Sequence, residues 1–242
     1  MPRSFSYSAL TLRVKNSGES NREAWFLTAE EGLLKATVFG GPKSRLRAQV
    51  APFHEGTLWI YHDPVRDSRK VTDFDARSYR TGIRELYERA MAADAVAQTI
   101  LSSHGGGGSW PAAFKLAGDV LDALACGQDG PHCSRIGIYF LWYWANLLGV
   151  RPDLSAHASD ASDVSGASDV GGVGEEFSAA SGGAPVPLGP GARLWLNKIS
   201  SLPPSSLVRV TLDNVSLKQA GSFTKALLAE VLGRQLPTWE GI

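Results

Sequence analysis

The sequence predicts an α+β protein of two domains, with strands over residues 1–79 and helices over residues 80–242. Two observations predict this division. Before residue 79, apolar and polar side chains alternate in short runs, which is the pattern of half-buried strands. After residue 79, apolar residues recur every three or four positions, which is the spacing of amphipathic helices. With 242 residues, 43% of them apolar, the chain can bury a substantial core.

The first domain should contain five short strands separated by turn residues. We expect them at Tyr7–Val14, Ala24–Ala29, Leu33–Phe39, Thr57–His62 and Val71–Tyr79. The turns include Asn16-Ser17-Gly18 and Gly40-Gly41-Pro42, where glycine supplies a positive φ and proline presets φ. Five strands at this spacing predict a small barrel or sandwich, and their number alone does not separate an OB fold from an SH3-like barrel.

The second domain should be a helical bundle. The predicted helices cover Ile83–Leu101, Phe114–Leu124, Cys133–Leu148, Leu194–Ile199 and Leu217–Leu232, while Leu207–Leu212 is compatible with a strand or a helix. The glycine run Gly105–Gly108 ends the first of them, and Ser109 is the candidate cap of the second. The Cys133–Leu148 helix is apolar on nearly all sides, so we expect it at the centre of the bundle.

A low-complexity segment interrupts the helical domain at about residues 155–192. Serine, alanine, glycine and aspartate dominate it, and it contains the near-repeat SDASDVSGASDV. Such a segment buries too little apolar area to offset the entropy of ordering it. We therefore predict a mobile insertion.

Charge is distributed unevenly, although 24 basic and 24 acidic side chains cancel in total. Residues 1–90 hold 15 Lys/Arg and 11 Asp/Glu, a net of +4, whereas residues 150–192 hold one Arg and six acids, a net of −5. This asymmetry is compatible with a nucleic-acid face on the first domain.

Several classes of protein are disfavoured. The two cysteines exclude a disulfide scaffold and fit a reducing compartment. No secretory peptide opens the chain, and the most apolar run, Ile136–Val150, is shorter than the ~20 residues of a bilayer span. We therefore expect no membrane association. Walker A, G-x-S-x-G and H-E-x-x-H patterns are absent, and we predict no enzymatic activity.

A compact basic cluster follows the Gly40-Gly41-Pro42 bend. It contains Lys43, Ser44, Arg45 and Arg47, with Lys35 on the strand before it. Such side chains suit the backbone of a polyanion, because cations that neutralise phosphates release counterions whatever the base sequence. The alternative interpretation is a solvated basic loop.

Two ordered sets of residues resemble the bacterial recombination mediator RecO. The first comprises Thr28, Gly32, Lys35, Gly40, Lys43-Ser44-Arg45-Leu46 and Pro52-Phe53, as in the amino-terminal domain of that family. The second comprises Phe140, Leu147-Leu148-Gly149 and Pro152-Asp153-Leu154, as in the family's aromatic helix that ends in Leu-Gly-x-x-Pro. The resemblance covers roughly residues 5–154.

The resemblance implies an OB fold and a non-enzymatic mediator in the bacterial cytoplasm, associated with the nucleoid. Such a protein binds single- and double-stranded DNA, anneals complementary strands, and promotes RecA loading together with RecR and single-strand DNA-binding protein (SSB). The implied DNA-binding residues are Lys35, Lys43, Ser44, Arg45 and Arg47, with Arg13 and Lys15 as further candidates. Two alternatives remain: a generic OB-fold RNA-binding or adaptor protein, and a nuclease or transferase that uses scattered carboxylates.

RecO proteins are thought to receive the acidic, Phe-ended tail of SSB in a pocket of the helical domain beside basic residues. Here the resemblance implies a groove lined by Tyr139, Trp142 and Tyr143, with Arg135 near its rim. A planar guanidinium suits a carboxylate. The alternative for Arg135 is an ordinary surface residue.

No cofactor is expected. Many RecO relatives carry a four-cysteine zinc knuckle after Leu-Gly-x-x-Pro, but here that region reads Leu154-Ser155-Ala156-His157. Cys126, His132 and Cys133 supply only three local candidates, whereas zinc takes four ligands. We therefore predict a metal-free protein.

Four aromatic residues fall on the predicted strands: Trp25, Phe39, Trp59 and Tyr61. Exposed aromatics of an OB fold can stack on bases. We expect most of these four to pack in the core instead.

Overall fold

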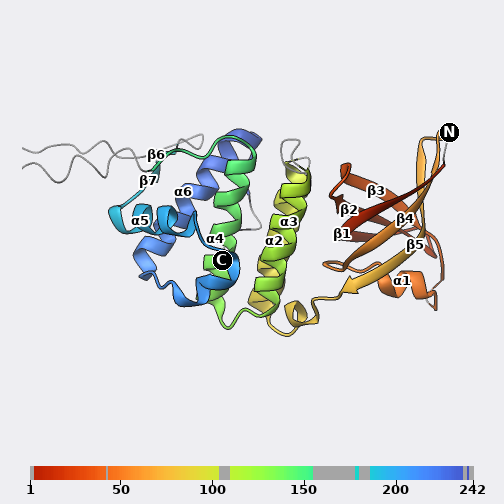
Figure 1. Cartoon of the computed structure of the whole chain (residues 1–242), viewed down its shortest axis with the longest axis horizontal. Coiled ribbons are helices and arrows are strands. Elements are labelled where there is room, and N and C mark those ends of the chain that lie inside the picture. The colour runs from red at the N-terminus through yellow and green to blue at the C-terminus, as the bar shows by residue number, and fades with distance from the viewer. Residues whose placement is uncertain are drawn as a thin grey trace, which may run out of the picture.

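The computed structural model describes residues 3–41, 43–103, 110–154, 178–179, 186–236 and 239. The first domain is a closed barrel with the strand order β1-β2-β3-β5-β4. Its strands are β1 (Ser4–Ser17), β2 (Asn21–Thr28), β3 (Gly32–Val38), β4 (Glu55–Asp63) and β5 (Ser68–Ser78). Figure 1 shows this barrel at one end of the molecule and the helices at the other. The predicted α+β class and OB-type barrel are confirmed.

Strand pairing closes the barrel at two seams. Consecutive strands β1–β2, β2–β3 and β4–β5 form antiparallel pairs, and the first half of β1 also pairs with β4. The second seam is a short parallel pairing in which Thr37 lies opposite Lys70, and Val38 opposite Val71. The short helix α1 (Arg45–Gln49) links β3 to β4 and packs against β5.

Each strand of the barrel turns alternate side chains inward, as the period of two predicts. On β3, Leu34, Ala36 and Val38 are buried, whereas Lys35 between them is exposed. The interior also contains Phe26, Leu58 and Phe74, which are fully buried. Charged side chains of the strands therefore lie on the outer surface.

The second domain is built around a central helix. Its elements are η1 (Thr81–Arg84), α2 (Tyr87–Ser102), α3 (Trp110–Ala125), α4 (Gly130–Leu147), α5 (Pro190–Ile199), η2 (Pro204–Arg209) and α6 (Asn214–Leu232), where η marks a 3-10 helix. Helix α4 contacts α2, α3, α5 and α6, so its predicted central position is confirmed. The Asp129 side chain accepts a hydrogen bond from the His132 amide (2.7 Å) and begins α4 three residues before the predicted start.

Two sequence-based expectations need correction. The ambiguous segment 207–212 is neither strand nor α-helix, since a 3-10 helix covers Pro204–Arg209. The predicted insertion extends too far toward the C-terminus, because Val186–Pro187 forms β7, which pairs with β6 (Ser178–Ala179). Leu188 is also buried, and α5 begins at Pro190. Residues 155–177 and 180–185 of that insertion lie outside the described residues, as do Pro42 and residues 104–109.

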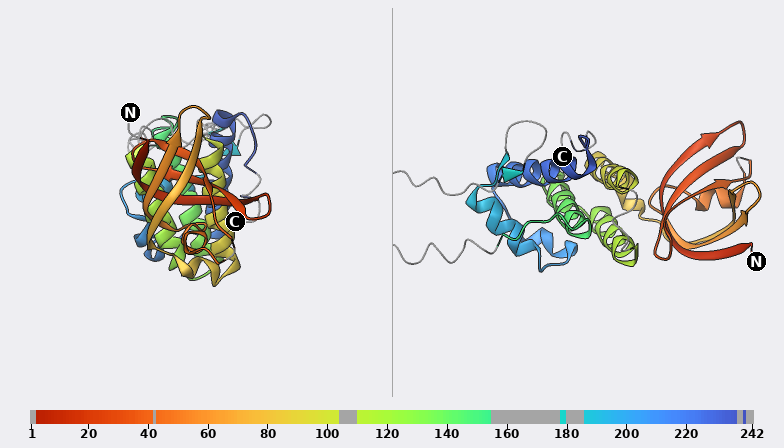
Figure 2. Two further views of the ribbon diagram at one scale, coloured as in Figure 1. Left: turned by 90° about the vertical axis from the view of Figure 1, so that its right-hand side faces the viewer. Right: turned by 90° about the horizontal axis from the view of Figure 1, so that it is seen from above.

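The two domains share a continuous apolar core. Leu10, Leu12 and Leu27 of the barrel belong to the same buried cluster as the helices. The views of Figures 1 and 2 agree that α2 and α3 lie between the barrel and the other helices. Gly32 shows how closely the domains approach: a Cβ atom there would lie 2.6 Å from the Trp110 ring.

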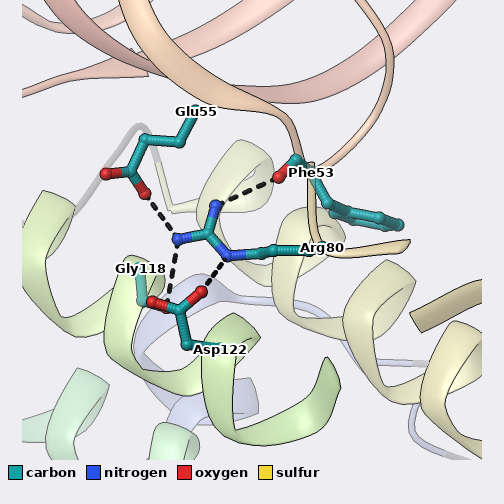
Figure 3. Close-up of polar contacts among 5 residues, drawn as sticks. All are labelled: Phe53, Glu55, Arg80, Gly118 and Asp122. Atoms are coloured by element: carbon teal, nitrogen blue, oxygen red, sulfur yellow. Dashed lines mark hydrogen bonds and ion pairs between the residues drawn. The ribbon is translucent and has the colours of Figure 1, made fainter. Parts of the chain in front are cut away.

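Arg80 ties the two domains together at their junction (Figure 3). Its side chain is 2% exposed and donates from Nη2 to Glu55 Oε2 (2.6 Å) and from Nε to Asp122 Oδ1 (2.7 Å). Further hydrogen bonds reach the carbonyls of Phe53 (3.0 Å) and Gly118 (3.4 Å). Glu55 and Phe53 belong to the barrel side and Asp122 and Gly118 to α3, so one guanidinium fixes the barrel against the helices.

No helix among the described residues is long and apolar enough to cross a membrane.

Candidate nucleic-acid interface

Cations and an indole form a row across the outer face of three strands. In the barrel register Arg13 of β1 lies opposite Trp25 of β2, and Trp25 lies opposite Lys35 of β3. Arg13 and Lys35 are exposed, and Trp25 is half-buried between them. The Lys35 Nζ atom lies 5.1 Å from the centre of the Trp25 ring and 2.8 Å from Glu23 Oε1. Directly paired side chains share one face of a sheet, so the row presents an aromatic surface flanked by positive charge.

The next row extends this surface to β5. Lys15 lies opposite Glu23, Glu23 opposite Thr37, and Thr37 opposite Lys70. The Lys70 Nζ atom lies 5.3 Å from the ring centre of Phe39, which is 44% exposed just beyond β3. We call this surface the sheet face; its cations and aromatic side chains are Arg13, Lys15, Trp25, Lys35, Phe39 and Lys70, with Glu23 and Thr37 between them.

The predicted basic loop forms a second group, the α1 cluster, which comprises Lys43, Ser44, Arg45 and Arg47. Ser44 precedes α1 with an extended backbone and makes no capping hydrogen bond through its side chain. Lys43 and Arg45 are exposed, and Arg47 is half-buried. Within the described residues, none of the three cations forms an ion pair, whereas Lys35 is paired with Glu23. Their charge is therefore available to an anionic ligand.

A half-buried arginine, Arg22, adds to the positive potential beside α1. Arg22 donates from Nη1 to the Arg47 carbonyl (3.3 Å), and its Nε has no partner among the described atoms. Burial, and secondly the charge of Arg47, hold the pKa of Arg22 below its ordinary value. An anion bound at Arg47 would relieve this repulsion.

The sheet face and the α1 cluster adjoin each other. Phe39 directly follows β3, and α1 begins six residues later in the sequence, at Arg45. All seven predicted DNA-binding residues thus fall into two neighbouring groups on one domain. From the sequence we considered Trp25 and Phe39 but favoured core packing for most of the strand aromatics, and we did not consider Lys70. Their alternation with buried neighbours was the available signal.

Comparison with known families agrees with this architecture. The family model described as Recombination protein O N terminal matches residues 1–78. The model described as Recombination protein O C terminal matches residues 84–240, so the two together span nearly the whole chain.

The chain belongs to the RecO family.

It is therefore a DNA repair and recombination protein of the mediator type. A search of curated proteins finds no significant match.

The strand aromatics of this RecO-family chain do not lie where we expected them. Trp59 is 37% exposed and Phe39 is 44% exposed. Leu58 and Ile60 on either side of Trp59 are buried, so the period of two forces the indole outward. The expectation of core packing is therefore wrong for these two side chains.

The rings expected to line a partner groove lie inside the helical domain. Tyr139 is 4% exposed and donates to the Leu202 carbonyl (2.9 Å), and Trp142 is 1% exposed and donates from Nε1 to Ser200 Oγ (2.8 Å). Tyr143, which is half-buried, donates to the Ser200 carbonyl (2.7 Å). These rings attach the end of α5 and the following loop to α4. They therefore do not line the open groove that we had expected.

Arg135 is half-buried rather than fully exposed. Its Nε lies in the interior without a hydrogen-bond partner among the described atoms. Burial, and secondly the charge of Arg135, lower the pKa of His132 one turn earlier on α4. The residue is not the freely accessible rim cation that the sequence predicts.

An open groove does exist on another face of α4. It has a volume of about 580 Å³ and lies between the start of α4 and helix α6. It is lined by Gly130, Pro131, Ser134, Ile138, Asn214, Leu217, Lys218, Gly221, Ser222 and Lys225. The exposed Lys218 therefore stands beside an apolar surface that includes Ile138 and Leu217. Sequence reasoning missed this α4–α6 groove because its two walls are about eighty residues apart.

The described residues do not provide a zinc site. No three His, Cys, Asp or Glu side chains come together within the ranges that the structure describes. Cys126 is exposed, whereas Cys133 is buried, and burial raises the pKa of its thiol. Residues 155–177, where relatives carry the knuckle, lie outside the described ranges.

Proposed function

We propose that this protein binds single- and double-stranded DNA through the sheet face and the α1 cluster, and that it acts as a non-enzymatic mediator. The observation that carries the proposal is the row Arg13–Trp25–Lys35 together with the adjoining α1 cluster, whose cations form no ion pair with any described residue. The family assignment supports it, because the barrel matches the amino-terminal family model.

The chemistry of this surface favours binding without sequence preference along most of a strand. Lysine and arginine neutralise phosphates and release counterions, which contributes equally for every sequence. An exposed indole stacks on any base, at about 1–3 kcal/mol per base. Cations serve both forms of DNA, whereas stacking requires unpaired bases. We therefore expect single strands to gain the additional contact.

Contacts of this kind are compatible with strand annealing. Phosphate and stacking contacts leave the Watson–Crick edges of most bases free, so a bound strand can still pair with its complement. The family resemblance adds the cellular setting: action at the nucleoid on SSB-coated strands, with RecR, to let RecA assemble. The described residues assign no surface to RecR.

The salt dependence of DNA binding tests the proposal. The triple variant K43A/R45A/R47A should bind unrelated sequences more weakly, and its salt slope should fall by roughly 0.7 per lost contact on single strands and 0.9 on duplexes. The matched control K198A/R209A/R234A removes three exposed cations of the helical domain and should keep the wild-type slope. Equal slopes for all three proteins would contradict the proposal.

The SSB tail belongs, in this proposal, to the α4–α6 groove rather than to the rings of α4. An acidic tail that ends in a phenylalanine needs an apolar pocket and a nearby cation. Ile138 and Leu217 supply the apolar surface, and Lys218 supplies the charge. Tyr139 and Trp142 do not line this groove, and their polar atoms are hydrogen-bonded to Leu202 and Ser200 instead.

Charge-reversal variants distinguish Lys218 from Arg135 as the cation that binds the tail. Lys218→Glu should abolish most of the binding of a tail peptide and the annealing of SSB-coated strands, while naked strands still anneal. Lys198→Glu, on α5, is the control and should leave peptide binding unchanged. Loss of peptide binding in Arg135→Glu but not in Lys218→Glu would move the site back to the start of α4.

Two alternative functions predict different results. A generic OB-fold RNA-binding or adaptor protein would bind strands without accelerating the pairing of complementary DNA. A nuclease or transferase would show turnover that depends on carboxylates. Annealing of complementary oligonucleotides without any change in their covalent structure is the outcome that the mediator proposal requires.

A further inference from the structure

A hollow of about 480 Å³ lies beside the α1 cluster and outside the sheet face. It is lined by Ser44, Arg45, Leu46, Gln49, Trp59, Asp73, Phe74 and Asp75. One wall is α1, and the other is the outer face of β4 and β5, where Trp59 lies directly opposite Asp73 in the register. The hollow therefore combines an indole, a guanidinium, an amide and carboxylates in one place.

Planar groups border this hollow. Trp59 is 37% exposed, so part of its indole is accessible to a ligand. Arg45 is exposed on the α1 side. Both an indole and a guanidinium plane stack on nucleobases. The two walls thus suit a flat, polar ligand more than an aliphatic one.

The carboxylates define the hydrogen-bonding character of the ligand. Asp73 Oδ1 accepts a hydrogen bond from the Phe74 amide (2.8 Å), which uses only part of the acceptor capacity of a carboxylate. Asp75 is 59% exposed in its side chain, and its ion pair within the described part of the chain is a long contact with Arg77 (3.9 Å). The two exposed carboxylates therefore retain acceptor capacity that a ligand donating N–H groups could use.

Guanine matches this pattern best among the DNA bases. Its N1–H and N2–H donors lie side by side and fit the two oxygens of one carboxylate, as other planar double donors do. Cytosine and adenine each offer one amino group to a carboxylate. Thymine offers a single N3–H between two carbonyl oxygens, which a carboxylate repels.

We propose that this hollow holds one unstacked base of a bound strand, with guanine preferred, stacked on Trp59 and hydrogen-bonded to Asp73. The inference rests on the proposed DNA-binding function and adds a base-selective subsite to it. Arg45 belongs both to the α1 cluster and to the hollow, so a strand whose phosphates contact the cluster brings its bases to the hollow's edge.

A cationic side chain of a partner protein would also suit an indole next to carboxylates. The positive charge around the hollow favours a DNA base over such a cation. Arg45 lies in the same hollow, and Lys43 and Arg47 lie in the same cluster without acidic partners among the described residues. A cation would meet their repulsion, whereas a polyanionic strand is attracted.

Replacing one base in a strand that otherwise contains only thymine tests the proposal. A short oligothymidine is compared with the same strand carrying one central guanine, using the full-length protein. The wild type should bind the guanine strand about tenfold more tightly, as a good double hydrogen bond to a base provides. Asp73→Asn and Trp59→Ala should each bring this ratio close to one. Glu19→Gln, an equal charge change in the β1–β2 turn, should keep the tenfold ratio.

The sign of the charge effect makes the test selective. Removing a carboxylate beside DNA should by itself strengthen binding of plain oligothymidine, so Asp73→Asn should lose preference without losing general affinity. Binding of oligothymidine with no guanine preference in the wild type, or with an undiminished preference in Asp73→Asn, overturns the subsite alone. No binding of either strand overturns the proposed DNA-binding function together with the subsite. Unchanged DNA ratios combined with weaker binding of a protein partner in both variants would assign the hollow to that partner instead.

Discussion

The aromatic side chains of the barrel and those of helix α4 contrast sharply in their surroundings. On the barrel, Phe39 and Trp59 are 44% and 37% exposed, and cations lie beside Trp25 and Phe39. On α4, Trp142 and Trp144 are 1% and 0% exposed. Both α4 indoles donate from Nε1 to a serine hydroxyl. The same residue types thus serve as a surface for ligands in one domain and as structure in the other.

Architecture explains the difference. A strand of a small barrel must turn every second side chain outward. The helices cover Leu10, Leu12 and Leu27, whereas Arg13 and Lys35 of the first row of cations are exposed. Helix α4 is surrounded by α2, α3, α5 and α6, so rings at almost any of its positions are enclosed. Exposure, more than residue type, marks the candidate site of this protein.

Truncation of matched tryptophans should give the largest contrast in stability. Trp144→Ala should lower the free energy of unfolding by about 3–5 kcal/mol, because it opens a large cavity in the core and removes the hydrogen bond to Ser103 Oγ. Trp59→Ala should change it by only about 0.5 kcal/mol, as exposed substitutions do. Urea unfolding of both variants measures the difference. Equal losses would mean that Trp59 is part of the core.

The next largest loss of stability should follow a substitution at the junction between the barrel and the helical domain. Arg80→Met should cost about 3 kcal/mol, because removing one partner of a buried ion pair leaves its carboxylates and two carbonyls without their donor. The side chain of Asp122 is 61% exposed and regains water, which limits the loss. Arg77→Met is the control, since that side chain is 74% exposed. The midpoint of thermal unfolding should fall for Arg80→Met and stay unchanged for Arg77→Met. An equal fall in both variants would contradict a specific role of Arg80 at the junction.

The smallest predicted effect is a dependence of stability on pH. Burial, as the largest cause, lowers the pKa of His54 and of His132 below the ordinary value of 6.5, so both are favoured in the neutral form in the folded protein. The unfolded chain takes up these protons first as the pH falls. The stabilising contribution is therefore complete above about pH 6.5 and is lost below it.

Substitution of one buried histidine should weaken that dependence. His54→Gln should flatten the fall of the unfolding free energy between about pH 6.5 and pH 5, the range in which an ordinary histidine becomes charged. His62→Gln is the control, because the His62 side chain is 28% exposed and lies beside Asp67. An identical slope in the wild type and in both variants would show that neither site contributes.

The sequence predicts the elements of this fold well and the exposure of its aromatic residues poorly. Periodicity is a local property, so the five strands and the central α4 were predictable from it. Whether a ring is exposed to solvent depends on segments that are distant in the sequence. Tyr139, for example, is covered by a loop more than sixty residues away, and the Leu202 carbonyl of that loop accepts its hydrogen bond. Arg80 shows the same limit, since Glu55 and Asp122 lie 25 and 42 residues from it along the chain.

The candidate site was predictable in part for a related reason. Lys43, Arg45 and Arg47 are close in sequence and therefore remain close in space. The row Arg13–Trp25–Lys35 is created by strand register, which a one-residue slip would destroy. The α4–α6 groove and the hollow beside α1 likewise combine segments that only the fold brings together.

Photo-crosslinking to single-stranded DNA tests the central claim most directly, namely that the exposed aromatics of the barrel contact DNA and those of α4 do not. A strand carrying iodinated uracil couples to aromatic side chains that touch its bases, and mass spectrometry of the peptides identifies them. The account predicts crosslinks at the exposed Phe39 and Trp59 and at the half-buried Trp25, and these should disappear when unlabelled strand is added in excess. Crosslinks confined to the helical domain, with none on the barrel, would contradict it.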